Sequence, residues 1–209
     1  NGTFSGSMIK QAAVTGTGTN TGGLLGSLTG TDVIASTAIL TTTGGTVSGS
    51  NSNIGGLIGS LGSAALATGN SNTFTNASTV SYSGSSNINS IGGIFGTIVS
   101  GLTITNNLTN NGAITYTGSG GSITSVGGIM GALTVNSTFS GALRNTIALT
   151  STGSNVGGLF GSMSNGSITG STNTNSAAIT GAGNLGGLIG NFSGGTLSGT
   201  FSNTGTVGT

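Results

Sequence analysis

Residues 157–161 read Gly157-Gly158-Leu159-Phe160-Gly161, and this order of two glycines, two large apolar residues and a third glycine occurs six times in the chain. We call each copy a GG block. The blocks begin at Gly22, Gly55, Gly92, Gly127, Gly157 and Gly186, and each ends at the glycine four positions later. Recurrence at a nearly constant spacing of this kind is the signature of a repeat protein, in which each repeat buries its apolar face against its neighbours.

Apolar residues recur at three places in each repeat. The first place is the GG block, which is followed, six positions after its first glycine, by Leu28, Leu61, Ile98, Leu133, Met163 and Phe192. The second place lies eleven or twelve positions after that glycine, at Val33, Leu66, Ile104, Phe139, Ile168 and Leu197. The third lies later in the repeat, at Ile39, Val80, Ile114, Ile147, Ile179 and Val207. Gly, Ser and Asn separate these clusters, so the pattern predicts three short strands per repeat, joined by turns.

A helix and a disordered linker are the alternative interpretations of the repeat. Apolar residues in and around the block are spaced 3, 1 and 3 apart, which is also the spacing of a helical face. Three glycines within seven residues would cost such a helix roughly 3 kcal/mol. We therefore favour a tight buried strand, whose glycines allow close backbone approach or a positive φ. Disorder is disfavoured because Leu and Ile are frequent and regularly placed, and the absence of proline suits continuous hydrogen-bonded strands.

The repeat length and its strand content together predict the fold. We expect an all-β protein, a parallel β-solenoid (β-helix) of about six coils with about 30–35 residues in each repeat. Residues 1–209 are predicted to form a single β-solenoid domain built of six tandem repeats, with no separate globular domain. Leu, Ile, Val and Phe should stack inside the solenoid, and Ser, Thr and Asn should cover the outside.

Two sets of residues are predicted to be structurally important. The first set is the three glycines of every block: Gly22, Gly23, Gly26, Gly55, Gly56, Gly59, Gly92, Gly93, Gly96, Gly127, Gly128, Gly131, Gly157, Gly158, Gly161, Gly186, Gly187 and Gly190. The second set is an asparagine ladder, in which equivalent amides stack coil on coil as they do in cross-β structures. Asn110, Asn145 and Asn175 lie eighteen positions after the first glycine of their block, and Asn203 lies seventeen positions after its own. With 22 asparagines in the chain, coincidence is the alternative explanation of this spacing.

The composition excludes several classes of function. Of the 209 residues, 69 are Ser or Thr and 45 are Gly, and the only charged side chains are Lys10, Asp32 and Arg144. Acid–base catalysis and metal sites need His, Cys or several carboxylates, so we predict no enzyme, no cofactor and no metal site. Two basic residues are too few to bind nucleic acid, and no apolar run is long enough for a membrane-spanning helix. We expect the three charged residues to lie on exposed turns, because an unpaired buried charge is costly.

The two ends of the chain share a short sequence. Gly2-Thr3-Phe4-Ser5 recurs as Gly199-Thr200-Phe201-Ser202, an offset close to a whole number of repeats, so the chain is predicted to begin and end at nearly the same phase of the repeat. Solenoids normally need polar caps, and neither end carries a proline, a charge cluster or an amphipathic helix. The near absence of charge also leaves little repulsion between copies. Two interpretations stay open: copies stack end to end, or the chain is a segment of a longer solenoid.

The string Val156-Gly157-Gly158-Leu159-Phe160-Gly161, followed by Asn165-Gly166-Ser167-Ile168, resembles the repeat of the GLUG-motif family. Residues 185–190, followed by Gly195-Thr196-Leu197, resemble the same unit, and tandem copies cover nearly the whole chain. Family members are typically parts of large secreted or surface-anchored bacterial proteins, including adhesin-like chains. The resemblance therefore implies an extracellular or cell-surface scaffold, and it carries no catalytic residue over to this sequence.

The leading prediction of function is a non-enzymatic extracellular structural protein that assembles end to end with copies of itself into a filament or surface layer. One alternative is an adhesin stalk that binds carbohydrate, such as cell-surface glycans, or another cell. Sugar sites commonly use an aromatic platform, whereas Tyr82 and Tyr116 fall in different repeats. A less favoured alternative is ice binding, which needs a regular threonine array. The alternating threonines at 15, 17, 19 and 21 and at 115 and 117 occupy different phases of the repeat and predict no continuous array.

Overall fold

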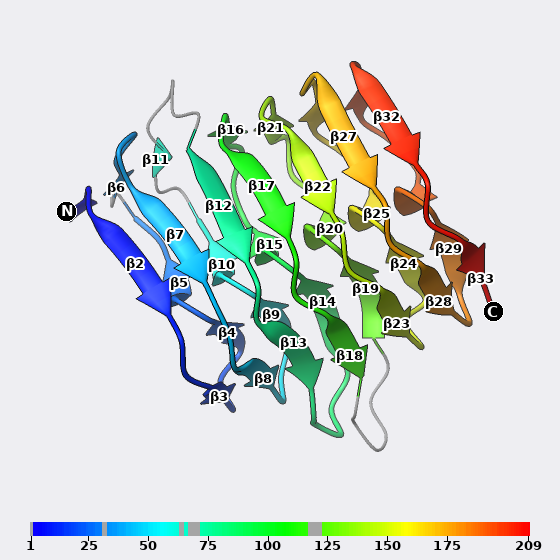
Figure 1. Cartoon of the computed structure of the whole chain (residues 1–209), viewed down its shortest axis with the longest axis horizontal. Coiled ribbons are helices and arrows are strands. Elements are labelled where there is room, and N and C mark those ends of the chain that lie inside the picture. Colours follow the sequence, from blue (N-terminus) through cyan, green and yellow to red (C-terminus); the bar gives the residue numbers. More distant parts are fainter. Residues whose placement is uncertain (1, 31–32, 63–64, 67–71, 117–122) are drawn as a thin grey trace.

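The computed structural model describes residues 2–30, 33–62, 65–66, 72–116 and 123–209. These ranges contain 33 short strands and no helix. The strands pair in parallel, and a strand's neighbours in its sheet are the strands five places before and after it in the chain. The described residues therefore form a parallel β-solenoid and contain no separate domain, which confirms the predicted fold class. Figure 1 shows the coils stacked side by side, with the two termini at opposite ends of the stack.

Each coil passes through five strand positions, which form five columns along the stack. Column I consists of β1 (Thr3–Phe4), β6 (Val33–Ile34) and β11 (Ala65–Leu66) in one sheet, and β16 (Thr103–Ile104), β21 (Thr138–Phe139), β26 (Ser167–Ile168) and β31 (Thr196–Leu197) in another. Column II consists of β2 (Ser7–Lys10), β7 (Ile39–Thr42), β12 (Thr73–Asn76), β17 (Asn107–Asn110), β22 (Leu143–Asn145), β27 (Thr172–Asn175) and β32 (Thr200–Asn203). Column III consists of β3 (Val14–Gly16), β8 (Thr46–Gly49), β13 (Thr79–Tyr82), β18 (Ile114–Tyr116), β23 (Leu149–Ser151), β28 (Ile179–Gly181) and β33 (Val207–Gly208).

The GG blocks form the last two columns, which are one strand shorter than columns II and III. Column IV consists of β4 (Asn20–Gly22), β9 (Asn53–Gly55), β14 (Ile88–Gly92), β19 (Ile123–Gly127), β24 (Asn155–Gly157) and β29 (Asn184–Gly186). Column V consists of β5 (Leu25–Leu28), β10 (Ile58–Leu61), β15 (Phe95–Ile98), β20 (Met130–Leu133), β25 (Phe160–Met163) and β30 (Ile189–Phe192). The first glycine of a block ends the column IV strand, the next two residues form a bend, and the third glycine lies inside the column V strand.

Two separate apolar cores run along the stack. The larger core lies between columns I, II and V, and it includes an edge-to-face contact between Phe139 and Phe160, whose ring centroids are 5.3 Å apart. The smaller core lies between columns III and IV, and Val80, Val126 and Leu149 are among its fully buried members. Because a strand alternates its side chains between two faces, the polar residues between these apolar positions face outward.

The structure corrects the predicted details of the repeat. Each coil has five strands instead of three, because the GG block folds into two strands and the column II strand was not recognised. Ile147 lies at a bend, and Leu149 takes its predicted place in column III. Ile39 belongs to column II and is 45% exposed, while Val47 is the buried column III residue of its coil. None of the block glycines has a positive φ, so close backbone approach alone explains them.

Candidate functional site

The most regular polar feature is a ladder of asparagine side chains that separates the two apolar cores. Its members end consecutive column II strands, and all but the last are buried: Asn76, Asn110, Asn145, Asn175 and Asn203. Each Nδ2 donates to the Oδ1 of the next asparagine along the stack, over distances of 2.8, 2.9, 2.8 and 2.8 Å. The four predicted members thus stack in one column, and Asn76 is a fifth.

Each ladder amide also binds its own coil. The second Nδ2 hydrogen donates to the carbonyl oxygen two residues later, as from Asn110 to Gly112 at 3.0 Å and from Asn175 to Ala177 at 2.8 Å. An Asx-type contact of this kind turns the chain, and here it marks the corner between columns II and III. The side chain therefore has two tasks: it links successive coils and it fixes the turn.

The second glycine of each block faces this ladder from the opposite wall. A Cβ atom on Gly158 would lie 2.4 Å from Cγ of Asn175 and 2.2 Å from the carbonyl oxygen of Gly187. Real Cβ contacts are never this short, so the wall admits only glycine. The other two glycines of the block are also required by close backbone contacts. A Cβ on Gly157 would lie 2.0 Å from the Phe160 carbonyl oxygen across the bend, and a Cβ on Gly161 would lie 2.4 Å from a column IV backbone nitrogen of the preceding coil. The predicted block glycines and the predicted asparagine ladder are thus two halves of one interface.

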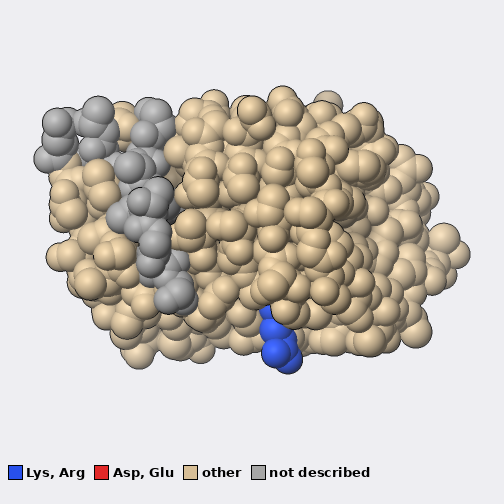
Figure 2. All heavy atoms as spheres, turned by 90° about the horizontal axis from the view of Figure 1, so that it is seen from above, with Lys and Arg blue, Asp and Glu red and all other residues tan. Residues whose placement is uncertain are grey.

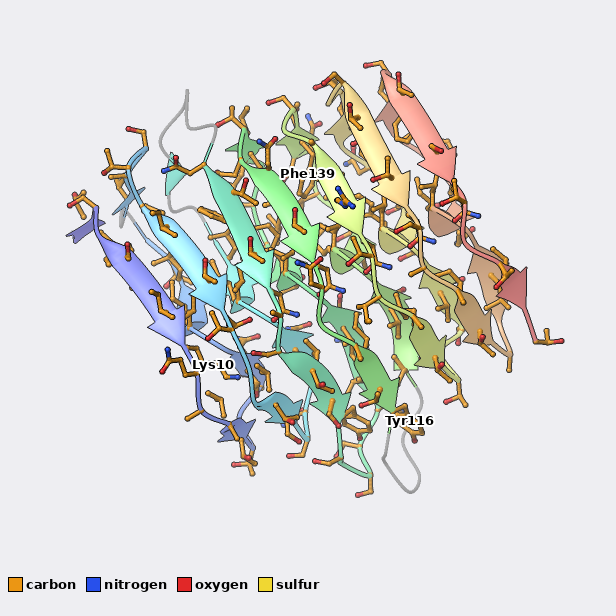
Figure 3. All side chains as sticks on the ribbon, viewed as in Figure 1. Lys10, Tyr116 and Phe139 are labelled. Carbon is orange, nitrogen blue, oxygen red and sulfur yellow. The ribbon has the colours of Figure 1, made fainter. Side chains whose placement is uncertain are left out.

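Lys10 occupies the first position of the ladder column. Its strand pairs in register with that of Thr42, whose hydroxyl contacts Asn76 Oδ1. The Lys10 side chain is only 7% exposed, and its Nζ donates to the Gly44 carbonyl oxygen at 2.8 Å and to Ser78 Oγ at 2.9 Å. Burial lowers the pKa of this amine from its ordinary value of 10.5. Figure 3 shows Lys10 at the end of β2, beside the first turn of the chain toward column III.

The prediction that all charged residues lie on exposed turns is therefore wrong for Lys10, because strand register places it in an inward-facing column. Arg144 is exposed, but it lies in strand β22 and not on a turn. Asp32 lies outside the described residues. The surface in Figure 2 carries one basic side chain, and every other described residue visible there is uncharged.

Both ends of the stack expose apolar hollows. At the N-terminal end the hollow is lined by residues that include Phe4, Met8 and Leu28, and at the C-terminal end by residues that include Leu188, Phe192 and Phe201. Within the described ranges, no segment folds across either end (Figure 1).

The predicted equivalence of the two ends is wrong. Thr3–Phe4 lies in column I, whereas Thr200–Phe201 lies in column II. The shared four-residue string therefore does not mark the same phase of the repeat. Its threonine and phenylalanine suit a short strand in either column.

The tyrosines and the threonines are arranged differently from the expectation, and Tyr82 is fully buried, so the tyrosine pair does not form an exposed platform. Tyr82 and Tyr116, although in different repeats, stack in column III with ring centroids 5.5 Å apart. Of the threonines predicted to alternate, Thr15 lies in column III and Thr21 is buried in column IV, while Thr117 lies outside the described residues. The aligned threonines are instead on the outer face of column II: Thr41, Thr75, Thr109 and Thr174.

Sequence reasoning missed Asn76 and two separate asparagine pairs in column IV. Asn76 lies further from the first glycine of its block, Gly55, than the other ladder asparagines lie from theirs, because a longer connection precedes its strand. A search at one fixed offset therefore does not find it. In these pairs, Asn53 donates to Asn20 and Asn184 donates to Asn155, both over 2.9 Å, and serines occupy the two levels between the pairs. The asparagine that stands two positions before the first glycine of four blocks is the signal for them.

The described residues contain no group of three or more metal-binding side chains, and none of their segments is a helix suited to crossing a membrane. These features define a parallel β-solenoid that is organised around a central amide ladder. No protein-family model matches the chain, and neither a curated protein nor a solved structure matches it. The resemblance to the GLUG-motif repeat stays a prediction.

Proposed function

We propose that the protein is a non-enzymatic extracellular structural protein whose solenoids assemble end to end into a filament. The observation that carries this proposal is that the described stack exposes an apolar hollow, with the backbone edges of its outermost strands beside it, at each end. Such edges pair readily with another chain that offers the same strand direction and spacing. Because both ends belong to one parallel stack, the strands at the C-terminal end of one copy run in the same direction as the strands at the N-terminal end of the next.

The electrostatics of the chain support the same proposal. Three charged side chains in 209 residues provide almost no repulsion between copies. Of the two that the structure describes, Lys10 is buried within the stack and only Arg144 is exposed. An assembly of this kind should therefore be insensitive to salt. The extracellular location rests on the resemblance to the GLUG-motif repeat alone.

The lengths of the columns set a condition on this assembly. Columns II and III hold seven strands, whereas columns IV and V hold six. When a second copy places β1, β2 and β3 on β31, β32 and β33, its β4 and β5 lie two levels above β29 and β30. One GG block at the joint would complete the level between them.

The test is therefore a chain extended after Thr209 by a copy of residues 182–194, which supplies that block. We expect polymers that lengthen with protein concentration and are unchanged by added salt, measured by negative-stain electron microscopy and sedimentation velocity. The control is the same extended chain with valine at the copy of Gly187. That valine faces the next coil, as the Cβ contacts of Gly158 indicate, and should stop growth without preventing folding. An extended chain that stays monomeric at every concentration would overturn the proposal.

A second candidate function, ice binding, is favoured by the outer face of column II. Thr41, Thr75, Thr109 and Thr174 occupy one row of this sheet, in which Arg144 stands between the last two. Parallel strands repeat at about 4.8 Å, so the hydroxyl and methyl groups of this row form a regular array of the kind that can order water.

Thermal hysteresis measures this second function. Arg144→Thr completes the row and should increase hysteresis, and Thr75→Lys should reduce it. Thr180→Lys, on the outer face of column III, is the matched control and should change nothing. If neither the natural chain nor Arg144→Thr gives hysteresis, the candidate is rejected.

A further inference from the structure

One position of column III changes abruptly in size along the side of the stack. It lies two residues after the buried core residue of each strand, and the register places six residues there in successive coils: Gly16, Gly49, Tyr82, Tyr116, Ser151 and Gly181. Two large rings are thus followed by two small residues. A hollow of about 210 Å³ lies where the ring of Tyr116 gives way to Ser151 and Gly181.

The coils also change in width at this point. Strands β14 and β19, which follow the two tyrosines in the chain, have five residues each, whereas β24 and β29 of the next two coils have three. Ile88 and Ile123 are the additional buried residues of the longer strands. A wide coil therefore meets a narrow one between β18 and β23, and the hollow lies at this step.

The ring of Tyr116 forms one wall of the hollow. One face of this ring stacks on Tyr82, with the centroids 5.5 Å apart and the planes 12° from parallel. Tyr82 is fully buried, and its hydroxyl donates to the Ser86 carbonyl oxygen, so the ring beneath Tyr116 is fixed. Tyr116 itself is half-buried, and Ser151 and Gly181 are too small to cover its second face. Figure 3 shows Tyr116 at the end of β18, where the chain leaves column III.

Threonine side chains line the hollow beside this aromatic wall. Thr150, Thr152 and Thr180 are among its lining residues, and all three are exposed. Each hydroxyl can donate one hydrogen bond and accept two. The described residues that line the hollow include no charged side chain. The hollow therefore combines one aromatic face with several neutral groups that both donate and accept.

We propose that this hollow binds one ring of a neutral carbohydrate. A sugar ring has a face of C–H groups, which packs on the apolar face of a tyrosine, and it has hydroxyls at its edge, which pair with threonine hydroxyls. The volume of the hollow is smaller than the roughly 300–1,000 Å³ of sites for larger ligands, so it suits a single ring. The hollow lies on the side of the stack, and end-to-end assembly would leave it open.

Saturation-transfer NMR on the full chain tests for this ligand. The probes are methyl β-glucoside, methyl β-galactoside and methyl α-mannoside, and sorbitol, which has the hydroxyls without the ring, is the control. We expect transfer from the protein to the C–H protons of at least one hexoside, with a Kd on the order of 1 mM, and none to sorbitol. No transfer to any of the three hexosides, or equal transfer to sorbitol, would overturn the proposal.

Three variants place the bound sugar in the hollow. Tyr116→Ala removes the aromatic wall and should weaken binding of the best hexoside about tenfold, whereas Tyr116→Phe keeps the ring and should bind within about threefold of the natural chain. Thr180→Ala removes a lining hydroxyl and should weaken binding about threefold or more. Thr115→Ala, in β18 beside Tyr116 and not among the lining residues named above, is the matched control and should change nothing.

Circular dichroism shows which variants fold. If Tyr116→Ala does not fold, Thr180→Ala carries the test, because its residue is exposed. Unchanged affinity in the folded variants would place the sugar elsewhere and overturn the proposal.

A planar aromatic compound is the alternative occupant, because aromatic rings also stack on tyrosine. Adenosine is the probe for it, and tighter binding of adenosine than of every hexoside would refute the carbohydrate assignment. The outcome is also separate from the proposed assembly. Sugar binding by a chain that never polymerises would leave the site and refute the filament, whereas polymerisation without sugar binding would refute the site and leave the filament.

Discussion

Replacement of Asn110 by alanine tests the ladder at its centre. Asn110 is fully buried, donates to Asn145 Oδ1 at 2.9 Å and accepts from Asn76 Nδ2 at 2.8 Å. Alanine at position 110 removes both bonds, so Nδ2 of Asn76 loses its acceptor and Oδ1 of Asn145 loses its donor, and both atoms stay buried. An unsatisfied buried polar group costs about 1–3 kcal/mol. Two such groups predict that the free energy of unfolding falls by about 2–6 kcal/mol.

Equilibrium urea unfolding, followed by far-ultraviolet circular dichroism, measures this loss. Hydrogen exchange should be measured as well, because repeat proteins can open locally without unfolding completely. We expect the amides of β17 and β22 to exchange faster in Asn110→Ala than in the natural chain. Thr109→Ala is the matched control: the residue is next to Asn110, faces outward, and should change stability by less than about 0.5 kcal/mol. If Asn110→Ala is no more destabilising than Thr109→Ala, the ladder does not stabilise the stack as we argue.

Two further perturbations test the wall opposite the ladder and the buried amine. Gly128→Val places a Cβ 2.2 Å from the Gly158 carbonyl oxygen and should lower the free energy of unfolding by about 3 kcal/mol or more. The control is Gly44→Ala, whose Cβ has no neighbour nearer than 3.8 Å, so its free energy of unfolding in the same urea titration should be nearly unchanged. Burial makes the pKa of the Lys10 amine lower in the folded protein than in the unfolded chain. Just below pH 10.5 the unfolded chain therefore binds more protons at this amine than the folded protein does, so the free energy of unfolding should rise as the pH approaches 10.5 from below. Thermal unfolding between pH 7 and 10 should show this slope in the natural chain and lose it in Lys10→Met; an unchanged slope in the variant would contradict the assignment.

The fold was predictable because its main determinant is periodic. Six GG blocks at a nearly constant spacing indicate stacked coils, and the shortage of charged residues and proline favours strands. The asparagine ladder was found in part for the same reason, since three of its members lie at one fixed distance from their blocks. Periodicity carries this information because equivalent residues in a parallel stack share one environment.

The details that depend on register were not predictable. Asn76 follows a longer connection, which shifts it in sequence but not in space. The burial of Lys10 follows from its pairing with Thr42, and no local pattern marks this lysine as an inward-facing residue. Column II escaped recognition because its inward positions change from Leu108 and Leu143 to Asn173, which interrupts the apolar pattern. In each case, pairing between coils overrides what the neighbouring sequence suggests.

The ladder has a direction, and in the proposed assembly this direction would determine how copies can join. Every Nδ2 donates toward the C-terminal end, so Asn203 presents a donor there, and a head-to-tail joint brings it toward Lys10 of the next copy. The ammonium group of Lys10 is also a donor and already binds Gly44 and Ser78 of its own chain, so the joint has no acceptor for Asn203. Lys10→Asn would place an Oδ1 atom at that point and continue the ladder across the joint. We therefore expect the extended chain carrying Lys10→Asn to form longer filaments at equal concentration than the extended chain alone, as measured by electron microscopy. The matched control is Lys10→Leu, which removes the charge without supplying an acceptor; equal filament lengths for the two variants would refute a ladder that runs through the joint.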